Sequence, residues 1–208
     1  MKATVQQQNL AHGLGTVSRA VTSRSTLAVL SNILIKTDNG RLRLSATNLE
    51  LGISAWIGAK VQDEGGLTVP ARTFVDLVSN LPNTEVTLSV DERTQSLNVK
   101  CGNLNTDIKG ISAEEFPPMP SPELDDAITL NLENFKEQIQ QVVFAASTDD
   151  ARPNLTGVQM LFEGSTLEMA ATDGYRISIA KSEMGQKVAQ TFKALVPARA
   201  LSELSRIA

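Results

Sequence analysis

The chain repeats itself, because three short segments return in the same order at nearly the same spacing. The spacing between a segment and its copy is 125 residues for two of the segments and 127 residues for the third. The segments, each given with its copy, are Leu30–Ile33 with Leu155–Val158, Ala46–Asn48 with Ala171–Asp173, and Val69–Arg72 with Val196–Arg199. Ordered matches at one spacing indicate a duplicated module of domain size. Since a duplicated binding or scaffolding module needs no catalytic centre, the repeat bears on function as well as on fold.

Length and composition fit two domains of a cytoplasmic protein. The 208 residues allow each module its own hydrophobic core. No apolar run approaches the roughly 20 residues of a membrane span, and the first residues lack the apolar core of a signal peptide. Cys101 and His12 are the only residues of their types. The sequence therefore predicts no intrachain disulfide, no cysteine-based or multi-histidine metal site, and no cofactor.

Each module combines two helices with an antiparallel sheet. Apolar residues at helical spacing predict a helix over Asn9–Thr22, and its copy lies over Asn134–Ala146. Alternating apolar residues on both sides of a turn then predict a hairpin in each module. A further strand (Leu51–Ile57 and Arg176–Lys181) and a second helix follow each hairpin. The VPAR motif (Val-Pro-Ala-Arg) opens that helix, with proline expected in its first turn. The fold class is therefore α+β, with duplicated modules of two helices packed on an antiparallel sheet.

The two modules are expected to differ in completeness. The first module continues through three more strands, expected at Val86–Val90, Ser96–Lys100 and Thr106–Ile111. A proline-rich linker, Phe116–Pro122, then joins the modules. The second module ends inside its second helix. We therefore expect a complete domain over residues 1–120 and an incomplete one over residues 121–208 that lacks its last strands, in a chain that is a fragment.

Cationic side chains on the helices are candidate DNA contacts. They are Arg19, Arg24, Arg72, Lys136, Arg199 and Arg206. Gln138, Gln140 and Gln141 are expected to add uncharged polar surface. Scattered cations are also normal on any solvated helix, and the net charge of −4 does not favour a nucleic-acid binder. The repetition of the same elements nevertheless favours a shared face that would contact phosphates without reading base sequence.

Two other groups have both an ordinary and a functional interpretation. Asp149 and Asp150 could be metal ligands, although adjacent carboxylates after a helix are usually solvated. Thr172–Gly174 is typical of a tight turn. Tyr175 and Arg176 follow that turn and could anchor a peptide, because aromatic and arginine side chains are common anchors. Ordinary packing beside a turn explains these residues equally well.

Together the motifs resemble those of the bacterial β sliding clamps, the processivity subunits of DNA polymerase III. The resemblance runs through the whole chain, with the motifs in order. The residues that carry it are Met1-Lys2, Arg24 with Leu27–Ile33, the paired VPAR motifs, Phe116-Pro117 and, above all, Ala171–Arg176. It implies that each subunit has three similar domains. Two such subunits would join head to tail as a homodimeric ring. Helices would line the hole, through which duplex DNA passes, and the subunit would catalyse nothing.

The resemblance also implies roles for particular residues. Arg24 and Arg152 match loop positions that touch DNA, and Thr106 and Ile108 match the subunit interface. The polymerase, the clamp loader and repair proteins would bind through a short linear motif. The residues that match the motif's pocket are Leu155, Thr172, Gly174, Tyr175, Arg176 and Ile177. The rest of that pocket and the third domain would lie beyond residue 208, so this chain alone is not expected to form the ring.

Two alternatives to the clamp remain open at this stage. The net negative charge is compatible with a duplicated α+β peptide-binding scaffold that does not bind DNA. An enzyme would have to rely on Asp149, Asp150 and Asp173, and metal-dependent turnover lost on changing Asp149 would support it.

Overall fold

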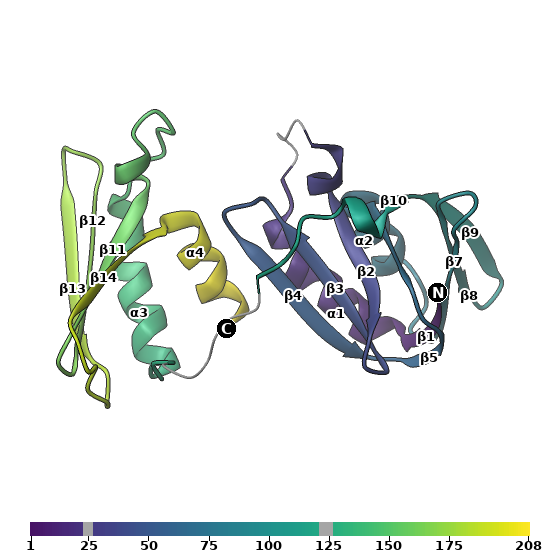
Figure 1. Ribbon diagram of the computed structural model, residues 1–208, viewed down its shortest axis with the longest axis horizontal. Helices are drawn as coiled ribbons and strands as arrows, with labels where there is room; N and C mark the ends of the chain where they lie inside the picture. Colours follow the sequence, from purple (N-terminus) through teal and green to yellow (C-terminus); the bar gives the residue numbers. More distant parts are fainter. Residues whose placement is uncertain (23–26, 121–126) are drawn as a thin grey trace. The chain divides into compact units, whose positions relative to one another are not determined.

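The chain folds into two compact units, which are described separately (Figure 1). The computed structural model describes residues 1–22, 27–120 and 127–208. Unit 1 is Met1–Pro120 and unit 2 is Ser121–Ala208.

Unit 1 holds two five-stranded antiparallel sheets and two α-helices. The first sheet has the strand order β5-β1-β7-β8-β9. Its strands are β1 (Lys2–Gln6), β5 (Lys60–Asp63), β7 (Glu85–Asp91), β8 (Ser96–Cys101) and β9 (Leu104–Lys109). The second sheet has the order β10-β6-β2-β3-β4. Its strands are β2 (Asn32–Asp38), β3 (Arg41–Thr47), β4 (Gly52–Gly58), β6 (Gly66–Pro70) and β10 (Ile111–Ser112). The helices are α1 (Gln7–Val17) and α2 (Ala71–Ser79), with short 3₁₀ turns η1 (Ser18–Ala20), η2 (Ala28–Ser31) and η3 (Ala113–Glu115).

Unit 2 packs two helices on one four-stranded antiparallel sheet of order β13-β12-β11-β14. Its strands are β11 (Gly157–Glu163), β12 (Thr166–Thr172), β13 (Ile177–Glu183) and β14 (Phe192–Pro197). The helices are α3 (Leu132–Val142) and α4 (Ala198–Ile207), with the 3₁₀ turns η4 (Val143–Ala145) and η5 (Pro153–Leu155).

The sequence repeat is a repeat of structure down to the strand register. Helix α3 begins and ends 125 residues after α1, and the order β14-β11-β12-β13 reproduces β6-β2-β3-β4. The pair Leu34↔Ser45 of β2 and β3 returns as Gln159↔Ala170 of β11 and β12. Because a slip of one residue would turn every side chain to the other face, the shared register fixes the same inward and outward positions in both units. The predicted α+β fold of duplicated modules is confirmed.

Several predicted boundaries were wrong. The first helix is shorter than Asn9–Thr22, because α1 ends at Val17 and a 3₁₀ turn follows. Strands β1, β5, β6 and β14 were not located. Pro70 does not lie in the first turn of α2; it ends β6 with an extended ψ of 118°, and the helix begins at Ala71. The strand expected to run from Thr106 to Ile111 breaks at Gly110, where a Cβ would overlap the backbone and side chain of β6.

The helices pack their apolar stripes on the sheets. In α1, the side chains of Leu10, Leu14 and Val17 are fully buried. Gly13 lies on the same side, and a Cβ there would be 2.9 Å from Leu44 Cδ1 and 3.0 Å from Ile57 Cγ2. The small residue therefore lets α1 approach β3 and β4 closely.

Replacing Gly13 with alanine is expected to lower the free energy of unfolding by about 1–2 kcal/mol, because the methyl group must displace packed core atoms. Gly15 is the matched control, since a Cβ at Gly15 would meet nothing within 4 Å. Gly15→Ala is expected to stabilise the protein by up to about 1 kcal/mol through helix propensity. Urea unfolding of both variants measures the difference. Equal stabilisation by the two substitutions would show that Gly13 is not a packing requirement.

Candidate functional site

A cavity of about 270 Å³ lies on the sheet of unit 2, on the face turned away from α3 and α4. It is lined by Asn154, Gly157, Gln159, Ala170, Ala171, Thr172, Ile177 and Leu195. We call this set the unit 2 groove. Its apolar walls are Ile177 and Leu195, which are 67% and 53% exposed. Leu195 lies against the Gly157 backbone, because a Cβ on that glycine would be 2.8 Å from Leu195 Cδ1. The groove therefore presents apolar surface to solvent, which is typical of a docking site.

Only part of the expected pocket lines this groove. Thr172 and Ile177 do so, and Leu155 is half-buried in η5 directly after the lining residue Asn154. Gly174, Tyr175 and Arg176 lie instead in the turn between β12 and β13. The lining residues Gly157, Gln159, Ala170 and Leu195 were not among the predicted site residues. The register with β14 brings Leu195 opposite Gln159, and β14 had no clear signal in the sequence.

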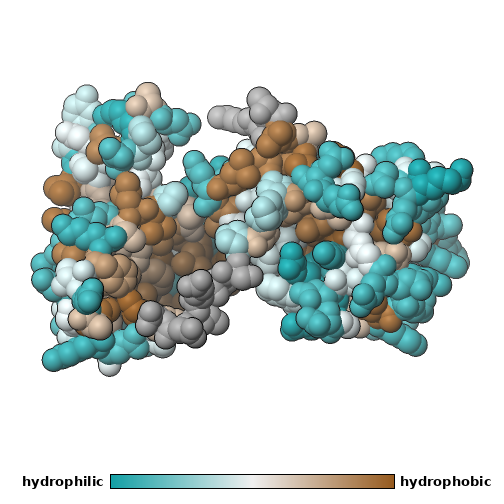
Figure 2. All heavy atoms as spheres, in the orientation of Figure 1, coloured by the Kyte–Doolittle hydropathy of each residue, from teal (hydrophilic) through white to brown (hydrophobic). Residues whose placement is uncertain are grey.

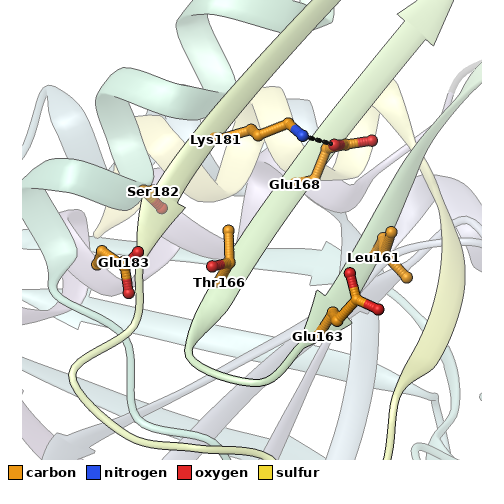
Figure 3. Close-up of a pocket in the computed structure, with 7 residues that line it drawn as sticks. All are labelled: Leu161, Glu163, Thr166, Glu168, Lys181, Ser182 and Glu183. Atoms are coloured by element: carbon orange, nitrogen blue, oxygen red, sulfur yellow. Dashed lines mark ion pairs between the residues drawn. The ribbon is translucent and has the colours of Figure 1, made fainter.

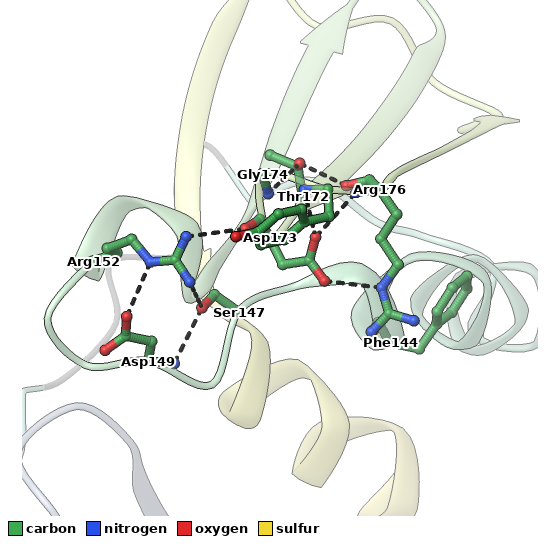
Figure 4. Close-up of polar contacts among 9 residues, drawn as sticks. Phe144, Ser147, Asp149, Arg152, Thr172, Asp173, Gly174 and Arg176 are labelled. Carbon is green, nitrogen blue, oxygen red and sulfur yellow. Dashed lines mark hydrogen bonds and ion pairs between the residues drawn. The ribbon is translucent and has the colours of Figure 1, made fainter.

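The turn before β13 is held by Asp173 and Thr172 (Figure 4). The Asp173 carboxylate accepts backbone N–H bonds from Tyr175 (2.9 Å) and Arg176 (3.0 Å). Thr172 Oγ1 accepts the Gly174 N–H (3.1 Å) and donates to the Arg176 carbonyl (2.6 Å). Gly174 has a φ of +93°, which suits glycine. These bonds set where β13, and therefore Ile177, begins.

Arg176 ties this turn to η4, and Arg152 ties it to the loop that follows η4. Arg176 Nε contacts Asp173 Oδ2 at 3.0 Å, and its Nη2 donates to the Phe144 carbonyl at 2.8 Å. The Arg176 guanidinium also lies 5.5 Å from the centre of the Phe144 ring. Arg152 Nε pairs with Asp149 Oδ2 at 3.0 Å, and its Nη1 donates to the Asp173 carbonyl at 3.2 Å. Both guanidinium groups are thus engaged in holding the loops beside the groove.

Tyr175 is 93% exposed and does not line the unit 2 groove.

The hydrogen bonds at Asp173 predict a pH dependence of the turn. Backbone N–H donation from Tyr175 and Arg176, with a smaller contribution from the Arg176 guanidinium, lowers the pKa of Asp173 below its ordinary value of 3.8. A lowered pKa in the folded state stabilises the turn at pH values above the ordinary value, and this contribution is lost as the pH falls through the lowered pKa. We expect an NMR titration of the Asp173 carboxyl to have its midpoint below 3.8. A midpoint at or above that value would contradict these bonds in solution.

The cationic side chains predicted to contact DNA differ in their solvent exposure and in the partners they already have. Arg72 has a 96% exposed side chain, with Asp76 at 3.9 Å, and Arg199 is exposed at the matching place in α4. Arg206 pairs with Glu203 at 2.9 Å, and Lys136 donates to the Ala208 backbone oxygen at 2.9 Å. Arg19 is exposed in η1. Arg24 lies outside the described residues.

The exposed side of α3 is not cationic. Glu133 and Glu137 are exposed there, at the positions that Gln8 and His12 occupy in α1. Gln138 was expected at the surface but is buried, because its side chain donates to the Leu167 and Ala180 carbonyls and accepts from Ser182 Oγ. Figure 2 shows apolar side chains on the part of unit 2 that carries α3 and α4, and Leu132, Leu204 and Ile207 of these helices are exposed. Of the predicted contacts in unit 2, Arg199 and Arg206 lie on α4, Lys136 lies on α3, and Arg152 lies in the loop before η5.

The two residues expected at a subunit interface lie on β9, an outer strand of the first sheet. Ile108 is 7% exposed and belongs to the core of unit 1, whereas Thr106 is half-buried. The surface that this strand offers is its exposed residues Leu104, Asn105, Asp107 and Lys109 and the half-buried Thr106, rather than the Ile108 side chain.

A second cavity of unit 2, of about 450 Å³, is acidic (Figure 3). Glu163, Glu168, Glu183 and Lys181 line it together with Leu161, Thr166 and Ser182. Lys181 Nζ contacts Glu168 Oε2 at 2.6 Å, and this hydrogen bond raises the pKa of Lys181. Among residues 1–22, 27–120 and 127–208, no three His, Cys, Asp or Glu side chains are grouped so that they could hold a metal ion. No helix within those ranges is long and apolar enough to span a membrane.

Comparison with known proteins gives consistent matches along the chain. Residues 1–120 match the family model of the DNA polymerase III beta subunit, N-terminal domain, and residues 129–208 match that of its central domain. A curated beta sliding clamp from Synechococcus elongatus is 39% identical over the whole chain, and one from Staphylococcus aureus is 31% identical. The chain spans 56% of the length of both relatives.

Solved structures agree with the sequence matches. A putative DNA polymerase III beta subunit from Eubacterium rectale has a TM-score of 0.94 at 32% identity, and the sliding clamp of Bacillus subtilis has 0.94 at 29%. Each comparison covers all of this chain and 56% of the other chain. With both family models matched in order and the strand register repeated between the units, the chain belongs to the family of bacterial DNA polymerase III beta subunits, the beta sliding clamps.

Proposed function

We propose that this chain forms part of a DNA sliding clamp, a processivity factor that encircles duplex DNA and tethers the replicative polymerase in the cytoplasm. The observation that carries the proposal is the match to two successive clamp domains by a chain whose units repeat in register. Residues 1–120 would be the first clamp domain and residues 121–208 would belong to the second. The mechanism is topological and needs no catalytic residue, because enclosure rather than tight binding keeps the clamp on DNA. The protein would assemble as a homodimeric ring, with the edge of β9 in the subunit interface.

The DNA contacts in this proposal are weak and directed to phosphates. Arg72 and Arg199 are exposed at matching positions of α2 and α4, so they can contribute one cation from each unit. Arg19, Arg24, Arg152, Lys136 and Arg206 are further candidates, although Arg152 and Arg206 already pair with carboxylates. Contacts to phosphates alone allow sliding, since they do not depend on base sequence.

Reversing both exposed cations tests this assignment. The double variant Arg72→Glu, Arg199→Glu is expected to bind DNA with a weaker salt dependence. The slope of the logarithm of the binding constant against the logarithm of the salt concentration should become shallower by roughly one unit for each lost phosphate contact. Lys100→Glu is the control, because Lys100 is an exposed cation on strand β8 rather than on a helix. A salt slope that Lys100→Glu lowers as much as the helix variant does would contradict a helix-borne DNA interface.

The unit 2 groove is the proposed partner site. Its exposed apolar walls, Ile177 and Leu195, suit a short linear motif from the polymerase, the clamp loader or repair proteins. Thr172, Gly174 and Arg176 position the turn beside it, and Leu155 and Tyr175 lie at its margin.

Primer extension tests the proposed function as a whole. With a loaded clamp, DNA polymerase III should extend a primer over thousands of nucleotides in one binding event on a long circular template, whereas without the clamp it should stop early. Product lengths that do not depend on the protein would refute the proposal. Salt-insensitive binding of peptides without any DNA retention would instead favour the duplicated peptide-binding scaffold, for which the carboxylates of α3 are the supporting observation.

A further inference from the structure

Unit 1 carries the same sheet face as the unit 2 groove, but there the face is covered. Because the strand registers match, the positions equivalent to the groove residues can be read directly. Asn154, Gly157, Gln159, Thr172 and Leu195 correspond to Val29, Asn32, Leu34, Thr47 and Thr68, and Ile177 corresponds to Gly52. Val29, Asn32, Leu34, Thr47 and Thr68 are all buried. In unit 2 the two apolar walls at these places are more than half exposed.

The cover on unit 1 is the segment Phe116–Met119, which we call the strap. Phe116 is 7% exposed and packs in one apolar cluster with Val29, Leu30 and Leu34. The Met119 side chain reaches Gly52, where a Cβ would overlap the Met119 Cε and lie 3.1 Å from its Sδ, while Gly52 itself stays partly open to solvent. The strap thus places an aromatic side chain at η2 and β2 and a methionine at the start of β4.

The short strand β10 precedes the strap and pairs with β6, so it brings the strap onto this face. Ile111 and Ser112 of β10 pair with Thr68 and Leu67 of β6. Thr68 Oγ1 donates to the Ile111 carbonyl at 3.0 Å and accepts from Asn32 Nδ2 at 2.9 Å. In unit 2 the residue equivalent to Thr68 is Leu195, which cannot make these bonds and exposes its side chain instead. The polar bonds of unit 1 therefore secure the cover, and the apolar substitutions of unit 2 leave a groove.

We infer that the strap is a built-in ligand that fills, on unit 1, the groove that stays open on unit 2, so that the two units offer one partner groove rather than two. The inference about partner number rests on the proposed function; the occupancy of unit 1 does not. A tethered segment acts at an effective concentration in the millimolar range, and Pro117 and Pro118 restrict its free conformations. A peptide of the same intrinsic affinity at micromolar concentration is therefore not expected to displace it.

The experiment removes the strap from the unit 1 face by substitution and then tests whether a separate strap peptide binds there. The variant Phe116→Asp with Met119→Asp removes the apolar contacts of the strap. The probe is a fluorescent synthetic peptide with the sequence of residues 113–120. We expect the number of peptides bound per chain to rise by one relative to the unaltered protein, and this added site to persist when Ile177→Asp blocks the unit 2 groove. No added site, with increased hydrogen exchange at Leu30 and Leu34 showing that the strap has left, would overturn the inference.

A second variant reaches the same state without changing the strap. Gly52→Ile places at unit 1 the side chain that unit 2 has at this position, and the end of the Met119 side chain, which now contacts Gly52, would have to move away from it. It should also expose the face and add one peptide site if the double variant does not fold. A control peptide with both apolar residues changed to aspartate should not bind. Loss of the added site on Ile177→Asp would show that the peptide binds only unit 2 and would refute the inference. Polymerase binding by the unaltered protein is measured separately, so its absence would count against the proposed function and not against the strap.

Discussion

Phe74→Ala is expected to lower the free energy of unfolding of unit 1 by about 3–5 kcal/mol, the range for removing a buried aromatic ring. Phe74 is the largest fully buried side chain of the chain's described residues, and it projects from α2 into the core between the helices and sheets of unit 1. Since typical domains are stable by only 5–15 kcal/mol, most of the stability of unit 1 would be lost. Unit 2 has a separate apolar core and should be little affected.

Hydrogen exchange resolved by residue measures this effect in each unit separately. Amides of β1, β3 and β7 should exchange at least a hundredfold faster in the variant, whereas those of β11 and β12 should not change. Thr73→Ala is the control, because Thr73 is exposed in the same helix and surface substitutions usually stay within about 0.5 kcal/mol. Equal acceleration in both units would contradict two independent cores.

Ile177→Asp is expected to weaken binding of the DNA polymerase III catalytic subunit at least tenfold, equivalent to about 1.4 kcal/mol. The substitution puts a charge in the apolar wall of the unit 2 groove. A partner side chain docked there would have to desolvate that carboxylate without an ion-pair partner. Folding should be unaffected, since Ile177 is already 67% exposed.

Ile179→Asp provides the matched control for the groove. Ile179 lies two residues along the same strand, on the same face, and is 54% exposed, but it does not line the groove. Surface plasmon resonance with the immobilised polymerase subunit compares the two variants. If the polymerase subunit binds in the groove, Ile177→Asp should weaken binding more than Ile179→Asp does. Equal weakening by the two variants would show that the added negative charge alone causes the loss. DNA loading by both variants should match that of the unaltered protein.

The repeat predicted the fold well because both copies obey the same inward and outward pattern. It located α1 and α3, the hairpins and the second helices, and the register later showed why the spacing is so constant. It did not predict Gln138, which takes the place of Gly13 in the copy. In unit 1, Gly13 lets the helix backbone lie close to the sheet. In unit 2, the hydrogen-bonded side chain of Gln138 fills the space between helix and sheet. A polarity pattern cannot distinguish these solutions.

The candidate groove was only partly predictable for a related reason. Thr172 and Ile177 were identified through the family motif, but Leu195 belongs to a strand that the sequence did not reveal and reaches the groove only through pairing with β11. The prolines of Phe116–Pro122, the segment that includes the strap, predict only a stiff linker. Its role as a cover depends on Gly52 and Thr68, which are distant in sequence and meet it only in the folded unit.

Retention on circular and linear DNA is the most direct test of the central claim that the protein acts by enclosing DNA. The protein is loaded onto a nicked circular plasmid, washed at a salt concentration that removes phosphate contacts, and then the plasmid is cut once with a restriction enzyme. We expect the protein to stay on the circle through the wash and to leave within minutes of the cut, because a ring slides off a free end. Loss during the wash, or equal retention on the circle and on the cut DNA, would contradict it.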